Sequence, residues 1–357
     1  MSRGSSPDFG RMERVLRRQG EPDRIPFYEH LADPEIMEAI TGLPMARYPL
    51  DVREGKEAYA KGLSQFYYQL GFDNVPFEVG PNLPGRGTLL GQDTAVLAHP
   101  QRGWQDEHGG PIQTLADFER YPWPEPDNAC DYELFEMVVR NLPAGMKIVG
   151  GAAGGVFEHG SWLMGLEPLS FAVYDSPQLV KVLFERVGTL LLEIDKRLLE
   201  IGGIGALRMG DDMGFKTATM LSPDLMRQHV FPWQKRIVRL AHDQGLPFVL
   251  HSCGNLEAVM DDLIGFVGID AKHSFEDVIM PVTEAKRRYG QRIAVLGGVD
   301  VDFLSRHSEH EVRGYTRDLI EQCAPGGGWA LGTGNSVANY IPVRNYLAML
   351  DEGRKTW

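Results

Sequence analysis

The stretch LPFVLHSCGN, residues 246–255, is the segment on which the fold prediction turns. It begins as a short apolar run and ends in His251, Cys253 and Gly254. Five other runs share this form, in which apolar residues lead to glycine or a polar residue: MKIVGGAAG (146–154), IGALRMGDDMG (204–214), GIDAKHS (268–274), RIAVLGGVD (292–300) and GGWALGTGNS (327–336). Helix-period segments lie between them, several opening at Ser-Pro or Ser-Glu and closing at Gly. Strand and helix in alternation predict parallel βαβ units.

The number of these units favours a closed barrel. Six runs, with one or two more in the less regular N-terminal third, approach the eight strands of a TIM (β/α)8 barrel. An open doubly wound sheet usually carries a GxGxxG loop, and the glycine-rich GGAAGG (150–155) lacks that spacing. We therefore predict the α/β class, with a TIM barrel and an N-terminal helical and loop elaboration.

The predicted domain organisation follows from the same reading. Residues 1–9 are expected to form a loose tail, and residues 10–357 a single barrel domain. Residues 24–30, RIPFYEH, are the first run expected to be a strand or extended entry, with Pro26 limiting its pairing. From about residue 31 to 127 the pattern is irregular, and we expect this part to elaborate the barrel as a cap.

Composition narrows the classes of partner. The formal net charge is -13 and no Lys/Arg-rich run occurs, which argues against a nucleic-acid or anionic-membrane surface. Three scattered cysteines do not suggest a disulfide framework, so a reducing cytoplasm is expected. The apolar segments are too short to span a bilayer, and we expect a protein with no membrane contact. The assembly is left open, a homodimer being one option.

Polar residues end nearly every apolar run. In a barrel, chemistry lies at the C-terminal ends of the strands, and buried polar groups there need a partner. The residues are Arg208, Asp211, Asp212, His251, Cys253, His273, Asp300, Thr333 and Asn335. His251 and Cys253 are two apart, which places them on one face of a strand, within reach of one metal ion. A core cysteine beside a hydrogen-bonded histidine is the alternative.

The other candidates have competing structural explanations. Of Asp211 and Asp212, one could accept a proton or bind metal or substrate, while the other caps a turn. Glu158 lies in an expected loop before GSWLMG, where it could line the pocket or be exposed. We take Asp212 and Glu158 as candidate catalytic residues. Candidate substrate-binding residues are Asp211, His273, Asp300 and Asn335, although a core position explains His273 and structural pairing explains Asp300.

The order of several motifs resembles the uroporphyrinogen decarboxylase superfamily, and especially its corrinoid-dependent methyltransferase branch. The motifs that carry the resemblance are GVFEHGSWLMGLE, GDDMGFKTATMLSPDLMRQHVFPWQKRI, LHSCGN, DLIGFVGIDAKHS, RIAVLGGVD and APGGGWALGTGNSVANYIPVRNYLAML. They extend over roughly residues 145 to 350, with a fainter match in RMERVLRRQGEPDRIPF.

The resemblance implies a methyltransferase that moves a methyl group between cobalamin, carried by a partner corrinoid protein, and a small-molecule donor or acceptor. Branch members that methylate thiols bind zinc through a His-x-Cys pair and a distant cysteine, and His251 and Cys253 match the pair. The distant cysteine would fall near the last strand, where this chain has GTGNS, residues 332–336. Asp212 and Glu158 are the candidates for a third ligand.

The chain also departs from the decarboxylases of the superfamily. Those enzymes carry paired arginines near the N-terminus that hold the substrate's carboxylates, whereas this chain has only Arg24 in the matching stretch. Porphyrinogen decarboxylation is therefore not expected. Two alternatives to methyl transfer remain open: a metal-independent lyase or decarboxylase acting on a small carboxylic acid, and a non-catalytic ligand-binding barrel.

Overall fold

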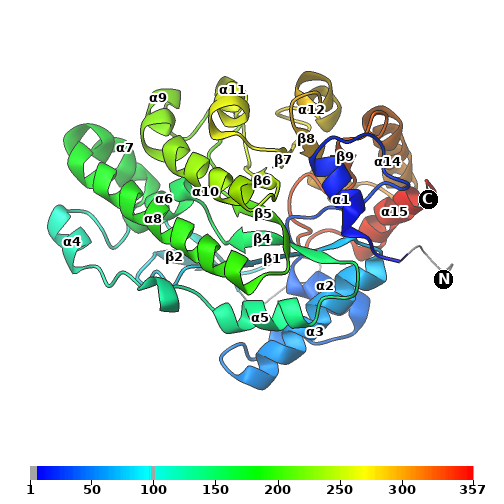
Figure 1. Cartoon of the computed structure of the whole chain (residues 1–357), viewed down its shortest axis with the longest axis horizontal. Helices are drawn as coiled ribbons and strands as arrows, with labels where there is room; N and C mark the ends of the chain where they lie inside the picture. Colours follow the sequence, from blue (N-terminus) through cyan, green and yellow to red (C-terminus); the bar gives the residue numbers. More distant parts are fainter. Residues whose placement is uncertain (1–5, 96, 98–100, 357) are drawn as a thin grey trace.

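The computed structural model describes residues 6–95, 97 and 101–356, and its centre is a curled parallel sheet of seven strands (Figure 1). In sheet order the strands are β1 (Asn74–Val79), β4 (Lys147–Ala152), β5 (Ile204–Gly210), β6 (Phe248–His251), β7 (Ala271–His273), β8 (Ala294–Leu296) and β9 (Trp329–Ala330). Each of the six apolar runs contains one strand, so the predicted parallel α/β sheet is confirmed. The seventh strand, β1, lies inside residues 31–127, the irregular part of the chain in which one or two further units were expected without a stated position.

A short segment joins the two edge strands of the sheet. Phe27 forms a parallel bridge with Leu331, and the Leu331 carbonyl accepts from Tyr28 N at 2.9 Å. On the other side, Asn74 Nδ2 donates to the Phe27 carbonyl at 3.0 Å. Pro26 has no N–H to donate, which limits backbone pairing here. The run RIPFYEH therefore makes a single bridge, where a regular strand was one of the expectations.

Helices surround the sheet. In chain order they are α1 (Phe9–Leu16), α2 (Pro34–Thr41), α3 (Arg53–Leu70), α4 (Leu115–Arg120), α5 (Tyr132–Arg140), α6 (Val156–Met164), α7 (Leu166–Asp175), α8 (Pro177–Ile201), α9 (Pro223–Leu225), α10 (Phe231–Asp243), α11 (Met260–Asp262), α12 (Val282–Tyr289), α13 (Val301–Arg306), α14 (Glu309–Cys323) and α15 (Val343–Arg354). Short 3-10 segments are η1 (Met45–Arg47), η2 (Pro126–Asn128) and η4 (Glu257–Val259), and π segments are η3 (Met226–Val230) and η5 (Leu263–Val267).

Local sequence explains where these helices start and change. Ser308 and Glu311 form a capping box at the start of α14, with Ser308 Oγ accepting from Glu311 N. The segment that begins at Ser222 was expected to be one helix, but Pro232 lacks the N–H that an α-helical ladder would need. The chain widens into η3 before α10, as helices commonly do where the ladder is interrupted.

The interior of the curled sheet is closed at one end by α1. Inward-facing strand residues, among them Ala206, Ala271, Ala294 and Ala330, pack with the apolar residues of α1 in one buried cluster. Phe9 belongs to this cluster and begins α1, so the loose tail expected over residues 1–9 does not extend to Phe9. Residues 1–5 of that predicted tail lie outside the described residues. The polar strand ends are thus at the opposite end of the sheet.

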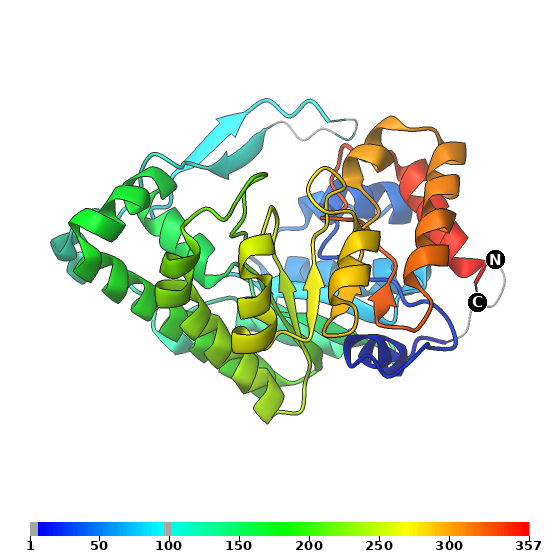
Figure 2. The same cartoon turned by 90° about the horizontal axis from the view of Figure 1, so that it is seen from above.

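A two-stranded hairpin lies on that opposite side. It consists of β2 (Thr88–Gly91) and β3 (Arg102–Gln105), and Figure 2 shows it on the side toward which the sheet strands point. Gln105 Nε2 donates to the Trp162 carbonyl at 3.5 Å, which ties the hairpin to α6. Across the described chain, none of the helices combines the length and the apolar character that a membrane crossing requires.

Candidate metal centre

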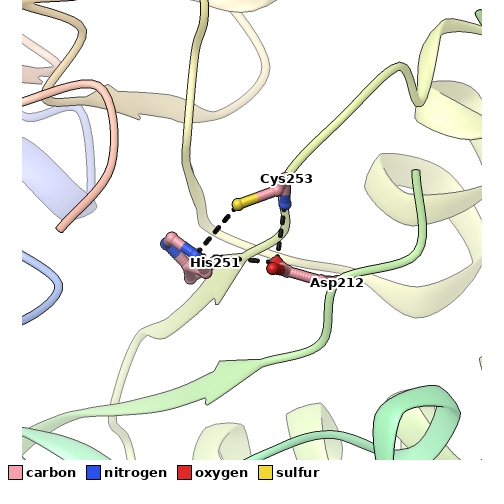
Figure 3. Close-up of side chains that lie close together, drawn as sticks. All are labelled: Asp212, His251 and Cys253. Carbon is pink, nitrogen blue, oxygen red and sulfur yellow. Dashed lines mark hydrogen bonds and ion pairs between the residues drawn. The ribbon is translucent and has the colours of Figure 1, made fainter. Parts of the chain in front are cut away.

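Three potential metal ligands meet at the carboxyl ends of β5 and β6. Asp212, His251 and Cys253 each offer one ligand atom, and these atoms all lie within 4.8 Å of one another (Figure 3). Cys253 Sγ is 3.5 Å from His251 Nε2, and His251 Nε2 is 3.6 Å from Asp212 Oδ1. His251 is buried, whereas the Asp212 side chain is 40% exposed. The group is therefore accessible to solvent on the side of Asp212, at the carboxyl ends of the strands.

Close contact between two loops brings these ligands together. Gly254 has φ of 81°, and a Cβ there would lie 2.2 Å from Gly214 backbone atoms, so only glycine allows the loops to approach this closely. Asn255 N donates to the Phe215 carbonyl at 2.7 Å across the same contact. Cys253 N donates to Asp212 Oδ1 at 2.8 Å. The aspartate after β5 is thus fixed beside the cysteine after β6.

A chain of hydrogen bonds fixes the tautomer of His251. His273 is the register partner of His251 on β7, and their Nδ1 atoms are 2.8 Å apart. His273 Nε2 is 2.9 Å from the Thr333 carbonyl, which can only accept, so His273 carries its proton on Nε2. Neutral His273 then accepts at Nδ1 from His251, and His251 Nε2 is left with a free lone pair. That lone pair faces Cys253 and Asp212.

The electrostatics of the site agree with neutral imidazoles. Burial, the largest cause, lowers the pKa of His251 well below its usual range and that of His273 to about 3. Burial, aided by the nearby charge of Asp212, raises the pKa of the Cys253 thiol above its usual range. Without a metal the thiol therefore keeps its proton and can donate it to His251 Nε2.

The donor set fits a zinc ion. Tetrahedral zinc with bonds of about 2.0 to 2.3 Å separates its ligand atoms by roughly 3.3 to 3.7 Å. Two of the three observed separations, 3.5 and 3.6 Å, fall in that interval, and the third, between Asp212 and Cys253, is within 4.8 Å. A neutral histidine bonded through its other nitrogen to a further group is the usual arrangement of a metal-binding imidazole. Asp212, His251 and Cys253 would hold the metal and leave a fourth position for a substrate.

Two more side chains contact the sulfur. Asn335 Nδ2 is 3.2 Å and Ser274 Oγ 3.5 Å from Cys253 Sγ. The structure therefore places Asn335, predicted to bind substrate, against a predicted metal ligand. His273, also predicted to bind substrate, has both ring nitrogens engaged by His251 and Thr333. Substrate contact by these two residues stays a prediction.

Asp211 and Asp300 lie elsewhere, at the starts of helices. Asp211 is fully buried, and its carboxylate accepts from the backbone N–H groups of Phe157 (3.2 Å) and Glu158 (2.9 Å) in α6 and from Gln234 Nε2 (2.8 Å). Burial raises its pKa to about 6. Asp300 caps α13, where its Oδ1 accepts from Asp302 N and Phe303 N, and its Oδ2 accepts from Asp277 N.

Glu158 lies in the first turn of α6, where a loop was expected, because Asp211 and Gly155 organise a helix start there. Its Oε2 accepts from Gly155 N at 3.2 Å. Burial, followed by the charges of Asp212 and Asp211, raises the pKa of Glu158 well above its usual range. Glu158 thus binds its proton more tightly than an ordinary glutamate does, and the charge of the candidate ligand Asp212 contributes to this.

His30 and Arg208 complete the surroundings of His251. The His30 ring stacks on His251 with centroids 3.8 Å apart, and sequence reasoning did not single it out. His30 ends the apolar run RIPFYEH, and this position could have identified it, because the other candidate residues were chosen as polar residues at the ends of apolar runs. Buried Arg208 donates to the His30 carbonyl at 2.6 Å and pairs with Glu78 at 2.6 Å.

The buried carboxyl of Glu29 contacts Thr333, the residue whose carbonyl bonds His273. Glu29 is fully buried, and its carboxyl oxygens are 3.2 Å from Thr333 N and 2.5 Å from Thr333 Oγ1. Thr333 Oγ1 also bonds the Asn335 carbonyl, which can only accept, so the hydroxyl proton goes to Asn335. Thr333 Oγ1 then accepts a hydrogen bond from the protonated carboxyl of Glu29. In agreement, burial raises the pKa of Glu29 to about 8.

Comparisons with known proteins give a consistent picture. Residues 107–356 match the sequence family described as "Uroporphyrinogen decarboxylase (URO-D)". Uroporphyrinogen decarboxylase from Alkalilimnicola ehrlichii is 24% identical over 256 residues, 68% of this chain and 66% of that protein, just under two thirds of its length. The enzyme of that name from Thioalkalivibrio sulfidiphilus is 24% identical over 264 residues, 69% of this chain and 70% of that protein. A methyltransferase from Methanosarcina mazei shares the fold, with a TM-score of 0.70, 97% of each chain covered and 15% identity.

Proposed function

The family match covers residues 107–356, more than half of this chain, so the chain belongs to the uroporphyrinogen decarboxylase family. We propose that it is a zinc-assisted methyltransferase. It would move a methyl group between a corrinoid protein that carries cobalamin and a small-molecule donor or acceptor. The observation that carries the proposal is the arrangement of Asp212, His251 and Cys253, with an unprotonated His251 Nε2 facing the other two. The fold shared with a methyltransferase supports a (β/α)8-type barrel, with residues 25–28 in the place of one strand.

Each residue has a separate task in this proposal. Asp212, His251 and Cys253 would hold zinc, which as a Lewis acid polarises the oxygen, nitrogen or sulfur that exchanges the methyl group. Glu158, whose raised pKa keeps it protonated, transfers a proton to the departing oxygen or nitrogen of a methyl donor. His273 holds the His251 ring and its tautomer.

The decarboxylase names of the relatives offer the competing function, and two of the buried arginines, Arg24 and Arg208, are already paired with carboxylates of the chain. A substrate with many carboxylates requires arginines that can reach it. Arg24 is buried, with its Nη2 donating to Asp73 Oδ1 at 2.7 Å, and Arg208 is paired with Glu78. Among the described residues near the candidate metal ligands, the Asp212 carboxylate would repel such a substrate.

The test is a methyl-transfer assay on the zinc-loaded protein. Free cob(I)alamin would be combined with a panel of methoxylated compounds, methylated amines and methylated thiols, and methylcobalamin formation followed by absorbance. We expect formation with one class of donor and its loss in Cys253→Ala. Release of CO2 from uroporphyrinogen or a small carboxylic acid, with no methylcobalamin from any donor, would overturn the proposal.

A further inference from the structure

We propose that Asn335 and Ser274 form a hydrogen-bonding cradle for the Cys253 sulfur and tune the bound metal in the place of a further anionic ligand. The inference rests on the proposed function, because it concerns the same metal site. It assigns Asn335 and Ser274 as positioning residues that act through Cys253, and we call the pair the sulfur cradle.

The orientation of the Asn335 amide follows from its other neighbour. Ser336 N lies 2.8 Å from Asn335 Oδ1, and a backbone N–H can only donate. The atom that it meets must therefore be the amide oxygen, so the NH2 group faces Cys253 Sγ at 3.2 Å. The backbone of Asn335 is also held, because Thr333 Oγ1 donates to its carbonyl. Asn335 thus presents a fixed N–H donor to the sulfur.

Ser274 presents its hydroxyl from a conformation that serine rarely adopts. Its φ is 81°, and among the described residues only Arg18 shares a positive φ outside glycine. Buried backbone in this region is maintained by its surroundings and concentrates at functional sites. Here the surroundings include Lys272, whose buried ammonium donates to the carbonyls of Ser274 (2.7 Å) and Ser252 (3.1 Å). Lys272 therefore clamps the turn that carries Ser274 to the turn that carries Cys253.

Donors to a cysteine sulfur have a defined effect on a metal site. N–H and O–H groups stabilise the ionised sulfur and withdraw part of the charge that it would give to the metal. The metal then stays more electrophilic toward the substrate. A second thiolate beside Cys253 would act in the opposite direction, by adding charge. The sulfur cradle therefore makes this a centre with one thiolate of reduced donor strength.

The test uses Co2+ in place of zinc, because thiolate-to-cobalt charge-transfer absorption reports the electron density on the sulfur directly. Asn335→Leu keeps the volume and removes the donor. We expect its charge-transfer band to move to lower energy and its Co2+ affinity at neutral pH to fall roughly ten-fold. Ser274→Gly removes the hydroxyl and suits the positive φ, so a band shift in the same direction is expected without loss of fold. Ser336→Ala, next in the chain with no bond to the sulfur, is the matched control and should leave the band unchanged.

The outcomes separate the two proposals. A parent protein that takes up no Co2+ would overturn the proposed function and the sulfur cradle together. Co2+-loaded parent and variants with identical charge-transfer bands would overturn the cradle alone. An equal shift in Ser336→Ala would also overturn it, because disturbance of the loop would then explain the effect.

Discussion

Two groups of polar side chains follow the strands at the same end of the sheet, and their side chains have different partners. Asp211 and Asp300 use their oxygens to bond the first N–H groups of α6 and α13. Asp212, next to Asp211 in the chain, stays partly exposed and meets His251 and Cys253. Asp212 remains available to a metal ion because its carboxylate does not cap a helix, as those of Asp211 and Asp300 do. We call Asp211 and Asp300 the helix-start carboxylates, and Asp212, His251 and Cys253 the metal cluster.

The largest predicted effect concerns Glu29, the buried carboxyl that contacts Thr333. The folded protein holds this proton to about pH 8, whereas the unfolded chain releases it near 4.5. The folded state binds more protons between these values, so stability falls as pH rises through this window, by at most about 1.4 kcal/mol per pH unit. Glu29→Gln, which cannot titrate, should lose the part of this dependence that Glu29 contributes, so its profile should be flatter than that of the parent. Urea unfolding at pH 5, 6, 7 and 8 measures it, and parallel profiles for the two proteins would contradict the protonated Glu29.

The next effect tests the helix-start carboxylates. Asp211→Ala leaves two backbone N–H groups of α6 and the Gln234 amide without their acceptor. We expect the free energy of unfolding to fall by about 2 to 3 kcal/mol, as a lost cap and an unsatisfied buried group would cause. Urea denaturation measures this. Unchanged stability would show that the comparison between Asp211 and its neighbour has no energetic basis.

A smaller effect is expected at His273, which connects the metal cluster to the sheet. His273→Phe removes the acceptor that fixes the proton of His251 on Nδ1. Zinc affinity should fall about ten- to hundred-fold, as it does when partners of metal-bound histidines are lost. Competition with a chromophoric chelator gives the affinity, and circular dichroism shows whether the variant is folded. Parent-like affinity in the folded variant would refute the proposed tautomer chain.

The smallest effect distinguishes the two groups most cleanly. Asp300→Ala should lower the free energy of unfolding by about 1 kcal/mol, the usual cost of a lost helix cap. Zinc affinity should stay at the parental value, because Asp300 bonds only α13 and Asp277 N among the described contacts of its carboxylate. A reduced zinc affinity in Asp300→Ala would show that Asp300 contributes to the metal cluster and is not only a helix-start carboxylate.

The sequence predicted the parallel sheet because apolar runs of strand length recur with helices between them. Asp212, His251 and Cys253 could be predicted to lie together, since parallel strands bring their carboxyl ends to one edge of the sheet. One or two further units were expected in the N-terminal third, but the position of strand β1 was not predicted, because NVPFEV contains Pro76 and lies in an irregular region. The sequence allowed either Asp211 or Asp212 to cap a turn, but which one does so depends on where α6 begins in space.

Other parts of the site depend on contacts between distant segments. Ring stacking of His30 on His251 joins the N-terminal segment to β6, and no spacing in the sequence indicates it. The contact of Asn335 with Cys253 joins residues 82 positions apart. The positive φ of Ser274 belongs to a residue type that does not favour it, so composition gave no signal.

The metal content of the purified protein is the most direct test of a metal centre built from Asp212, His251 and Cys253. The parent protein, Cys253→Ala, Asp212→Ala and Asp300→Ala would be purified, supplied with zinc, dialysed and submitted to elemental analysis. We expect about one zinc per chain in the parent and in Asp300→Ala, and loss of the zinc in Cys253→Ala and Asp212→Ala. No zinc in the parent, or equal zinc in all four proteins, would contradict a metal centre built from Asp212, His251 and Cys253.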